Sequence, residues 1–413
     1  MAKIIPFCAV RPRADLAERI AALPYDVYSR EEACKKVRDD QYSFLRIDRP
    51  ETQFPADYDM YAPEVYAKAR EMLDDMIGDG AFIQEENRAY YVYELIMDGR
   101  SQVGICACAS VDDYENRVIK KHENTRTDKE ADRIRHVDTC SAQTGPIFLA
   151  YRRREGIEQE VCKAMKKPPV YDFTAEDGIV HRVWVIDESD SIEKIRREFE
   201  QVQSVYIADG HHRCASAVRV SQMRREKYPD YTGEEEFNYF LSVLFPDDQL
   251  MIMDYNRVVK SLGEYSEEAF LAKVQEIFGV EQMGKEPYHP QSKGEIGMYL
   301  GDTWYRLTIN KTCYTGDPVE DLDVAVLQRE LLEPVLGILD PKVDQRIDFV
   351  GGIRGLEELV RRVHTDARAA FAMYPTDIHE LFAVSDAGKL MPPKSTWFEP
   401  KLRSGIFIHK IER

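Results

Sequence analysis

The residues best suited to chemistry form one run, Asp209-Gly210-His211-His212-Arg213, directly after the apolar segment 205–208. The apolar segment predicts a short buried strand, and small residues at helical spacing predict a helix over 211–227. Gly210 permits a tight turn and the close approach of a ligand. The start of a helix attracts phosphate, and an arginine such as Arg213 can hold phosphate oxygens at two points. The run therefore predicts an anion site.

Asp209 does not fit simple anion binding, because a carboxylate repels a phosphate. Such a group is useful if it accepts a proton or holds a metal ion. The alternative is a capped helix start with two surface histidines. Four polar, titratable residues against a buried strand exceed what a cap needs, which favours a functional site.

A second candidate segment contains His122, Glu123 and Arg126, followed by Arg133. The zinc-protease pattern HExxH is absent because position 126 is arginine. On any regular element His122 and Glu123 would point in different directions, so both can contact one ligand only from a loop. Glu123 is a candidate general base or metal carboxylate, with His122, Arg126 and Arg133 binding anions. The alternative, which composition alone favours, is the solvated charged face of a helix.

Two further segments offer anion-binding groups. Lys394, Ser395 and Thr396 follow two prolines and could bind anions, or could belong to a packed C-terminal loop. Arg46 lies between apolar neighbours in 43–47, which predicts a strand. It could anchor a substrate carboxylate or be a paired structural arginine.

Composition and charge limit the class of protein. The chain has 413 residues, of which 44% are hydrophobic and 31% charged, as in ordinary globular proteins. A net charge of −18 disfavours nucleic acid and anionic lipid as partners. Eight scattered cysteines show no zinc spacing and predict reduced thiols. Without an apolar run of signal or membrane-spanning length, we expect a soluble cytoplasmic protein.

The pattern of elements predicts a mixed α/β (α+β) fold. Segments 89–96 and 102–111 predict two strands, the Asp-Gly pair between them predicts a hairpin turn, and 127–141 predicts a charged helix. We expect three segments: an N-terminal α/β segment, 1–85; a catalytic core, 86–260; and a C-terminal α/β lobe, 261–413, with an ordered proline-rich loop at 390–401.

The Ala-Asp-Gly-His-His-Arg segment, 208–213, resembles the signature of the ParB/sulfiredoxin-like superfamily. The match is closest to the free serine kinases of that group, which carry Asp-Gly-His-x-Arg. This resemblance implies a ParB/sulfiredoxin-like core around the strand-turn-helix unit. Sulfiredoxins place a cysteine before the His-Arg pair, whereas Cys214 follows it here. Reduction of a cysteine sulfinic acid is therefore not expected.

A wider set of motifs resembles one large bacterial and archaeal family that was catalogued as a domain of unknown function. The motifs are Pro24-Tyr-Asp-Val27, Ser43-Phe-Leu-Arg-Ile47, His122-Glu-Asn-Thr125, Asp209-Gly-His-His-Arg213 and Met391-Pro-Pro-Lys-Ser-Thr396. Some members are described as kinases of free serine, with pyrophosphate as a donor in place of a nucleotide. The resemblance implies Asp209 at the reacting centre, and Glu123 is the candidate for a second carboxylate acting as base.

The leading hypothesis is phosphoryl transfer from pyrophosphate or a nucleotide, with Mg²⁺, to the hydroxyl of L-serine or a similar small molecule. The alternatives are a ParB-like switch that binds CTP without kinase activity, and a metal-dependent hydrolase. No metal ligand is assigned, although Asp209 or Glu123 could serve. The acceptor, the donor and a homo-oligomeric state stay open. The expected roles are catalytic for Asp209, Glu123 and His211; phosphate-binding for Gly210, His212, Arg213, His122, Arg126, Arg133 and Lys394; and substrate-binding for Arg46, Ser395 and Thr396.

Overall fold

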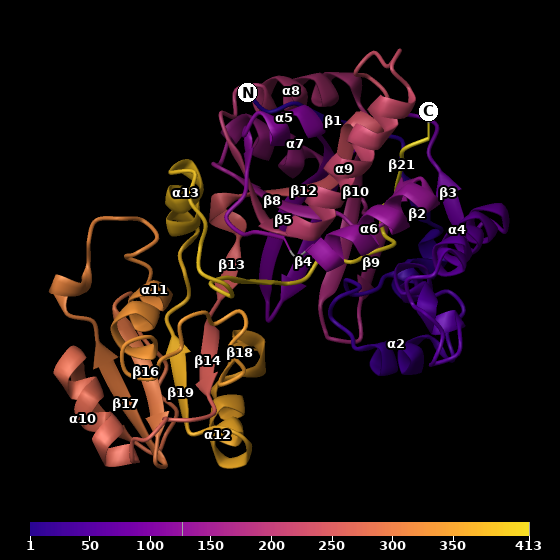
Figure 1. The fold of residues 1–413 in the computed structure, drawn as a ribbon. Helices are drawn as coiled ribbons and strands as arrows, with labels where there is room; N and C mark the ends of the chain where they lie inside the picture. The colour runs from indigo at the N-terminus through magenta and orange to yellow at the C-terminus, as the bar shows by residue number, and fades with distance from the viewer. Residues whose placement is uncertain (126, 413) are drawn as a thin grey trace. The chain divides into compact units, whose positions relative to one another are not determined.

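The computed structural model describes residues 1–125 and 127–412, apart from the side chain of Asp128. The chain divides into two compact units, Met1–Leu250 with Pro400–Arg413 and Met251–Glu399 (Figure 1). Each unit combines helices with a sheet, so the mixed α/β class is confirmed. The expected segment 1–85 and residues 86–250 of the expected segment 86–260 belong to the same unit, and the end of the chain returns to it.

The first unit contains the helices and strands that position the 209–213 run. Its helices are α1 Ala17–Ile20, α2 Arg30–Val37, α3 Leu45–Asp48, α4 Pro63–Gly78, α5 Val111–Glu115, α6 Thr127–Cys140, α7 Glu155–Ala164, α8 Ser189–Phe199 and α9 His211–Lys227. Its strands are β1 Ile4–Ile5, β2 Val10–Pro12, β3 Phe82–Gln84, β4 Tyr90–Met97, β5 Arg100–Ser110, β6 Ile119–Lys120, β7 Ala142–Gln143, β8 Ile147–Tyr151, β9 Tyr171–Thr174, β10 Val180–Ile186, β11 Val205–Asp209, β12 Tyr239–Pro246 and β21 His409–Lys410.

The main sheet of this unit has the order β6-β11-β8-β12-β5-β4-β10-β9, with β1 beside β5. Strand β6 is parallel to β11, with Ile119 opposite Val205, whereas β8 is antiparallel to β11. The register between β11 and β8 shifts between Ile207 and Asp209. Because the carboxyl ends of parallel strands meet at one edge, the segments after β6 and after β11 leave the sheet together.

The expected hairpin is confirmed as β4 and β5, paired from Tyr91–Cys106 to Met97–Arg100. Asp98 and Gly99 at the turn have φ of 51° and 78°. Two consecutive left-handed residues match the twist of a tight hairpin, and an Asp-Gly pair tolerates them.

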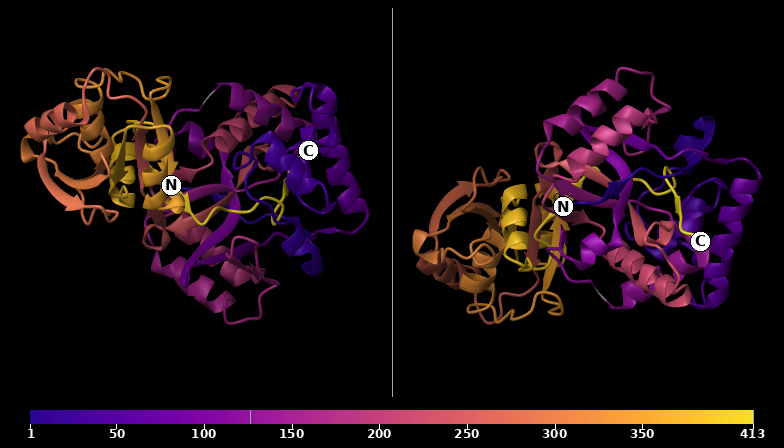
Figure 2. Two further views of the ribbon diagram at one scale, coloured as in Figure 1. Left: turned by 90° about the horizontal axis from the view of Figure 1, so that it is seen from below. Right: turned by 90° about the horizontal axis from the view of Figure 1, so that it is seen from above.

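The hydrophobic core explains the positions of α7, α8 and α9. Alternate residues of the central strands form one cluster with side chains of these helices, among them Ile157, Ile195, Phe199, Cys214 and Ala217. The C-terminal segment lies beside N-terminal residues (Figure 2), with bridges between Val10 and Ile408 and between Ala22 and Ser404. Residues distant in the sequence therefore close this unit.

The second unit is built on an antiparallel sheet of the order β15-β17-β16-β19-β14-β18. Its strands are β13 Met251–Met253, β14 Tyr255–Val259, β15 Gly279–Gly284, β16 Glu295–Leu300, β17 Thr303–Thr308, β18 Ile347–Gly351, β19 Ala369–Met373 and β20 Trp397–Glu399. Its helices are α10 Glu267–Ile277, α11 Asp323–Leu327, α12 Leu356–Thr365 and α13 Ile378–Asp386. None of the helices in the described part of the chain has the length and apolar character needed to cross a bilayer.

The expected strand at 43–47 is wrong, because this segment forms the helical turn α3. The Phe44 carbonyl accepts hydrogen bonds from the N–H groups of Ile47 and Asp48 at 2.9 and 3.1 Å. Phe44, Leu45 and Ile47 are buried in one cluster. A short apolar run fits a buried helix as well as a buried strand, and tertiary packing decides between them.

Candidate functional site

The parallel pairing of β6 and β11 brings two candidate motifs together. His122 follows β6 by two residues, Asp209 ends β11 and His211 opens α9. The His122 and His211 rings pack edge to face, with centroids 4.6 Å apart. His122 and His211 are 89 positions apart in sequence but meet at one edge of the sheet because parallel strands end at the same edge.

Glu123 joins the two histidines. One ligand atom from each of His122, Glu123 and His211 lies within 4.8 Å of the others. Residues 121–125 form neither helix nor strand. This loop is what allows neighbouring side chains to face the same point, as the sequence required for any shared ligand.

Both imidazoles are buried, with exposed fractions of 2% for His122 and 8% for His211. Burial lowers the pKa of His122 to about 4, and burial with the neighbouring His122 lowers the pKa of His211 well below its usual range. Both rings are therefore neutral near pH 7, and each has one nitrogen with a free lone pair. A neutral imidazole can accept a proton or bind a metal ion.

Asp209 is ionised at neutral pH. Its Oδ2 lies 3.0 Å from Nζ of Lys401, and its Oδ1 accepts the Gly210 N–H at 2.7 Å. Burial alone would raise the pKa of Asp209, but Lys401 and Arg213 hold it well below its usual range. The sequence analysis missed Lys401, although it ends the expected loop 390–401. Only the return of the C-terminal segment to the first unit brings it to Asp209.

Gly210 shapes the start of α9. Its φ of +88° lies in the left-handed region, and an added Cβ would lie 3.1 Å from the Arg213 guanidinium. As N-cap, glycine offers no side chain to the helix N–H groups, and the first turn contains no acidic residue. The partial positive charge of this helix end is therefore not cancelled by its own first turn.

Arg213 and Arg133 line one small cavity of about 30 Å³, together with Asp48 and Thr144. Arg213 donates to the Pro146 carbonyl at 2.6 Å. Arg133 pairs with its neighbour Asp132 at 2.9 Å. This volume holds a water molecule or two rather than a phosphate. Arg133 is thus near Arg213, as expected of an anion site, but its charge is largely compensated.

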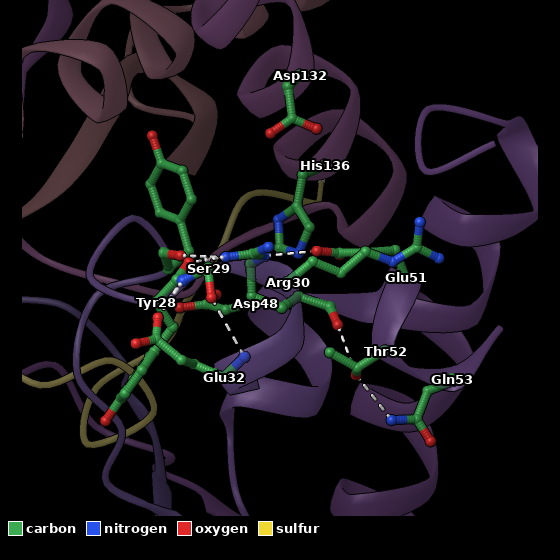
Figure 3. Close-up of polar contacts among 12 residues, drawn as sticks. Tyr28, Ser29, Arg30, Glu32, Asp48, Glu51, Thr52, Gln53, Asp132 and His136 are labelled. Atoms are coloured by element: carbon green, nitrogen blue, oxygen red, sulfur yellow. Dashed lines mark hydrogen bonds and ion pairs between the residues drawn. The ribbon is translucent and has the colours of Figure 1, made fainter. Parts of the chain in front are cut away.

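A buried polar cluster next to this cavity was missed at the sequence level. Asp48, Glu51 and His136 are each no more than 3% exposed, and Figure 3 shows them in one region with Asp132. Arg49 pairs with Glu51 at 2.5 Å. The same arginine donates to the carbonyls of the Pro24–Val27 motif and the next residue, Tyr25 at 2.9 Å and Tyr28 at 2.6 Å. Arg49 is therefore a paired structural arginine that joins its own segment to Tyr25 and Tyr28.

Arg46 itself lies elsewhere. It donates to the Gln41 carbonyl at 2.8 Å and lines a cavity of about 300 Å³ with Arg13 and Lys68. No residue of the 209–213 run lines that cavity. Its expected substrate-binding role stays a prediction for a separate place in the first unit.

The remaining predicted site residues belong to other parts of the chain. Lys394, Ser395 and Thr396 belong to the second unit. Ser395 is buried and donates to the Pro392 carbonyl at 2.7 Å, and Lys394 lies over the Tyr255 ring. Their binding roles stay predictions, and Arg126 lies outside the described residues. Cys214 is fully buried and burial raises the pKa of its thiol, as in an unreactive structural cysteine.

The site thus combines a lysine-paired aspartate, two neutral histidines, a glutamate and a helix start in a mixed α/β unit. The model of the family described as "Protein of unknown function (DUF1015)" matches residues 4–325. The chain belongs to that family.

Solved structures give weaker likenesses. SbnI with a C-terminal truncation from Staphylococcus aureus has a TM-score of 0.37 and 12% identity, covering 71% of this chain and 82% of that one. A mutant free serine kinase in complex with ADP has a TM-score of 0.33 and 14% identity, covering 74% and 87%. A conserved hypothetical protein from Pyrococcus furiosus has a TM-score of 0.34 and 14% identity, covering 74% and 94%. These scores are too low to transfer an activity, and no curated protein matches the chain.

Proposed function

We propose that this protein is a phosphotransferase that moves a phosphoryl group from pyrophosphate or a nucleotide to the hydroxyl of free L-serine or a similar small alcohol. The observation that supports it most is Asp209, placed at the end of β11 between Lys401 and the uncapped start of α9. A carboxylate beside cationic groups and helix N–H groups suits a reaction in which a hydroxyl attacks a phosphate. In this proposal the β11–α9 unit is the ParB/sulfiredoxin-like element of the fold.

In the proposed reaction, the serine hydroxyl oxygen forms a bond to the transferred phosphorus as the bond to the leaving oxygen breaks. The hydroxyl proton passes to Asp209 or Glu123, and phosphate or the shortened nucleotide leaves with the bonding electrons. Arg213, His212 and the start of α9 neutralise the charge that spreads over the phosphoryl oxygens. Lys401 is added here to the residues inferred from the sequence, because it sets the charge and position of Asp209.

Mg²⁺ fits this site as an ion that arrives with the donor. It prefers oxygen ligands, keeps several waters and needs only one or two protein carboxylates. Asp209 and Glu123 are the carboxylates that this edge of the sheet offers. The ion would supply neutralisation of the donor's charge, while the chain's own residues position the acceptor and take its proton.

The test is direct. The purified full chain is incubated with L-serine and Mg²⁺ and, separately, with pyrophosphate, ATP, ADP or CTP, and O-phosphoserine is measured by mass spectrometry. We expect product with at least one donor and its loss in Asp209→Asn. No product with any donor would contradict the proposal, and CTP binding without turnover would favour the nucleotide-switch alternative.

A further inference from the structure

His122, Glu123 and His211 form a donor set that the proposed phosphotransfer does not itself require. Their ligand atoms lie within 4.8 Å of one another. Two imidazole nitrogens and one carboxylate oxygen are typical ligands of zinc, iron(II) and related ions. Mg²⁺ prefers an all-oxygen set, so this group differs from a donor-bound magnesium site.

Two atoms of this group lack the hydrogen bonds that buried polar atoms normally make. Among the residues that the structure describes, Nδ1 of His122 and Nε2 of His211 are buried without a hydrogen-bond partner. The two imidazole rings lie next to each other, packed edge to face. Buried polar atoms without a partner are rare in folded proteins, and each calls for a bound ligand or another compensating group. One metal ion would satisfy both nitrogens at once.

The other side of His122 is already fixed in the way that metal-binding histidines usually are. The Ile207 carbonyl of β11 accepts a hydrogen bond from His122. A metal-bound imidazole usually donates its second N–H to a carbonyl or carboxylate, which fixes the tautomer and the ring orientation. The β6–β11 pairing thus fixes the His122 ring, and Nδ1 is the nitrogen of this ring that is left without a partner.

We propose that His122, Glu123 and His211 bind one divalent transition-metal ion of the zinc class. With zinc–ligand bonds of about 2.0–2.1 Å, tetrahedral ligand atoms lie about 3.4 Å apart, so the ligand atoms, which lie within 4.8 Å of one another, close by at most about 1.4 Å on binding. Three protein ligands leave a further position for water or for an oxygen of a bound anion. The ion would thus lie next to the Asp209–Arg213 turn.

This inference stands apart from the proposed phosphotransfer, because the ion can be measured on protein without donor or acceptor. It has one consequence for that reaction. A metal-bound Glu123 can neither take the serine proton nor hold Mg²⁺, which leaves Asp209 as the base and the donor's oxygens and water as the ligands of Mg²⁺.

The experiment titrates chelator-treated full-length protein with Co²⁺, followed by visible absorption, and with Zn²⁺, followed by calorimetry. We expect one ion per chain, a visible Co²⁺ spectrum and a raised melting temperature with Zn²⁺. His122→Gln, Glu123→Gln and His211→Gln should each weaken binding by about 100-fold or more. His212→Gln is the matched control, since it removes the adjacent histidine of the same motif and should leave the affinity unchanged.

Folding of each variant is checked by circular dichroism and thermal melting, and Glu123→Gln is the most conservative change. Absence of stoichiometric Co²⁺ and Zn²⁺ binding by the folded chain would overturn the metal site. Equal loss of affinity in His211→Gln and His212→Gln would do the same. Failure to detect O-phosphoserine has no bearing on these outcomes, so the two proposals fail separately.

Discussion

In the first unit, the buried His181 and the buried pair His122 and His211 differ in the hydrogen bonds that their ring nitrogens make. His181 has both nitrogens engaged: Tyr93 Oη lies 2.8 Å from Nδ1, and Nε of Arg403 donates to Nε2 at 3.2 Å. Because arginine can only donate, Nε2 accepts and Nδ1 carries the proton. His122 and His211 are equally buried, yet within the described chain each has a nitrogen without a partner.

The difference separates a structural histidine from a candidate ligand. The network of His181 satisfies its polar atoms and stabilises the fold. The pair at the β6–β11 edge carries buried polar atoms that cost stability unless a ligand binds. If this is so, substitutions around His181 should change mainly stability, and substitutions at the β6–β11 edge should change mainly function.

The largest expected effect is on catalysis. Asp209→Asn should lower the rate of O-phosphoserine formation by about 10²–10⁴-fold, because the proton acceptor is lost. The free energy of unfolding should also fall, because Lys401 loses the carboxylate with which it pairs. Asp177→Asn is the control: it removes the same charge from a carboxylate paired with Arg403 and should leave the rate unchanged. Similar loss of activity in both variants would contradict the division.

The next effect is on stability. Arg403→Met removes the cation that contacts both His181 and Asp177, and the Arg403 side chain is only 4% exposed. We expect the free energy of unfolding in urea to fall by about 2–3 kcal/mol, less than for a fully buried pair because Asp177 is 40% exposed. Zn²⁺ affinity of the folded variant should be unchanged, and a loss of affinity would link the two groups.

A smaller effect concerns pH. Burial and Arg403 lower the pKa of His181 to about 3 from its ordinary 6.5. Below pH 6.5 the unfolded chain binds a proton that the folded chain excludes, so stability present above pH 6.5 is lost as the pH falls towards 3. One such group contributes roughly 1.4 kcal/mol per pH unit in this window. His181→Gln should flatten the dependence of unfolding free energy on pH between 6 and 5 by about that amount; identical slopes would show that His181 does not contribute.

The smallest effect is expected at the unpartnered pair. In metal-free protein, His122→Leu should change the free energy of unfolding by no more than about 1 kcal/mol. It removes one unsatisfied nitrogen but also removes the donor to the Ile207 carbonyl. Urea denaturation of this variant beside His181→Leu provides the comparison. A larger loss for His122→Leu than for His181→Leu would reverse the assignment of roles.

Local patterns in the sequence predicted the elements that depend on local physics. The Asp98-Gly99 turn, the helix His211–Lys227 and the strand before Asp209 all follow from periodicity and from residues with special backbone preferences. The segment 43–47 failed because a short apolar run has no period that separates helix from strand. Its helical form depends on burial against other parts of the chain.

Only part of the candidate site was predicted from the sequence, because the rest depends on contacts between distant segments. The residue types of the 209–213 run predicted a functional site. Nothing in the sequence predicted the burial or pairing of Lys401 and Glu51, because a single lysine or glutamate is common on any surface. Lys401 reaches Asp209 across 192 positions of sequence. Glu51 is buried and pairs with Arg49.

The sequence by itself determined the family, the acidic charge and the chemistry available at the strand-turn-helix, since these depend on residue identity and local spacing. The tertiary structure decided that the side chains of His122 and Glu123 lie next to that of His211, and that Lys401 pairs with Asp209. Both depend on the parallel pairing of β6 with β11 and on the return of the C-terminal segment, which are long-range contacts that no local pattern encodes.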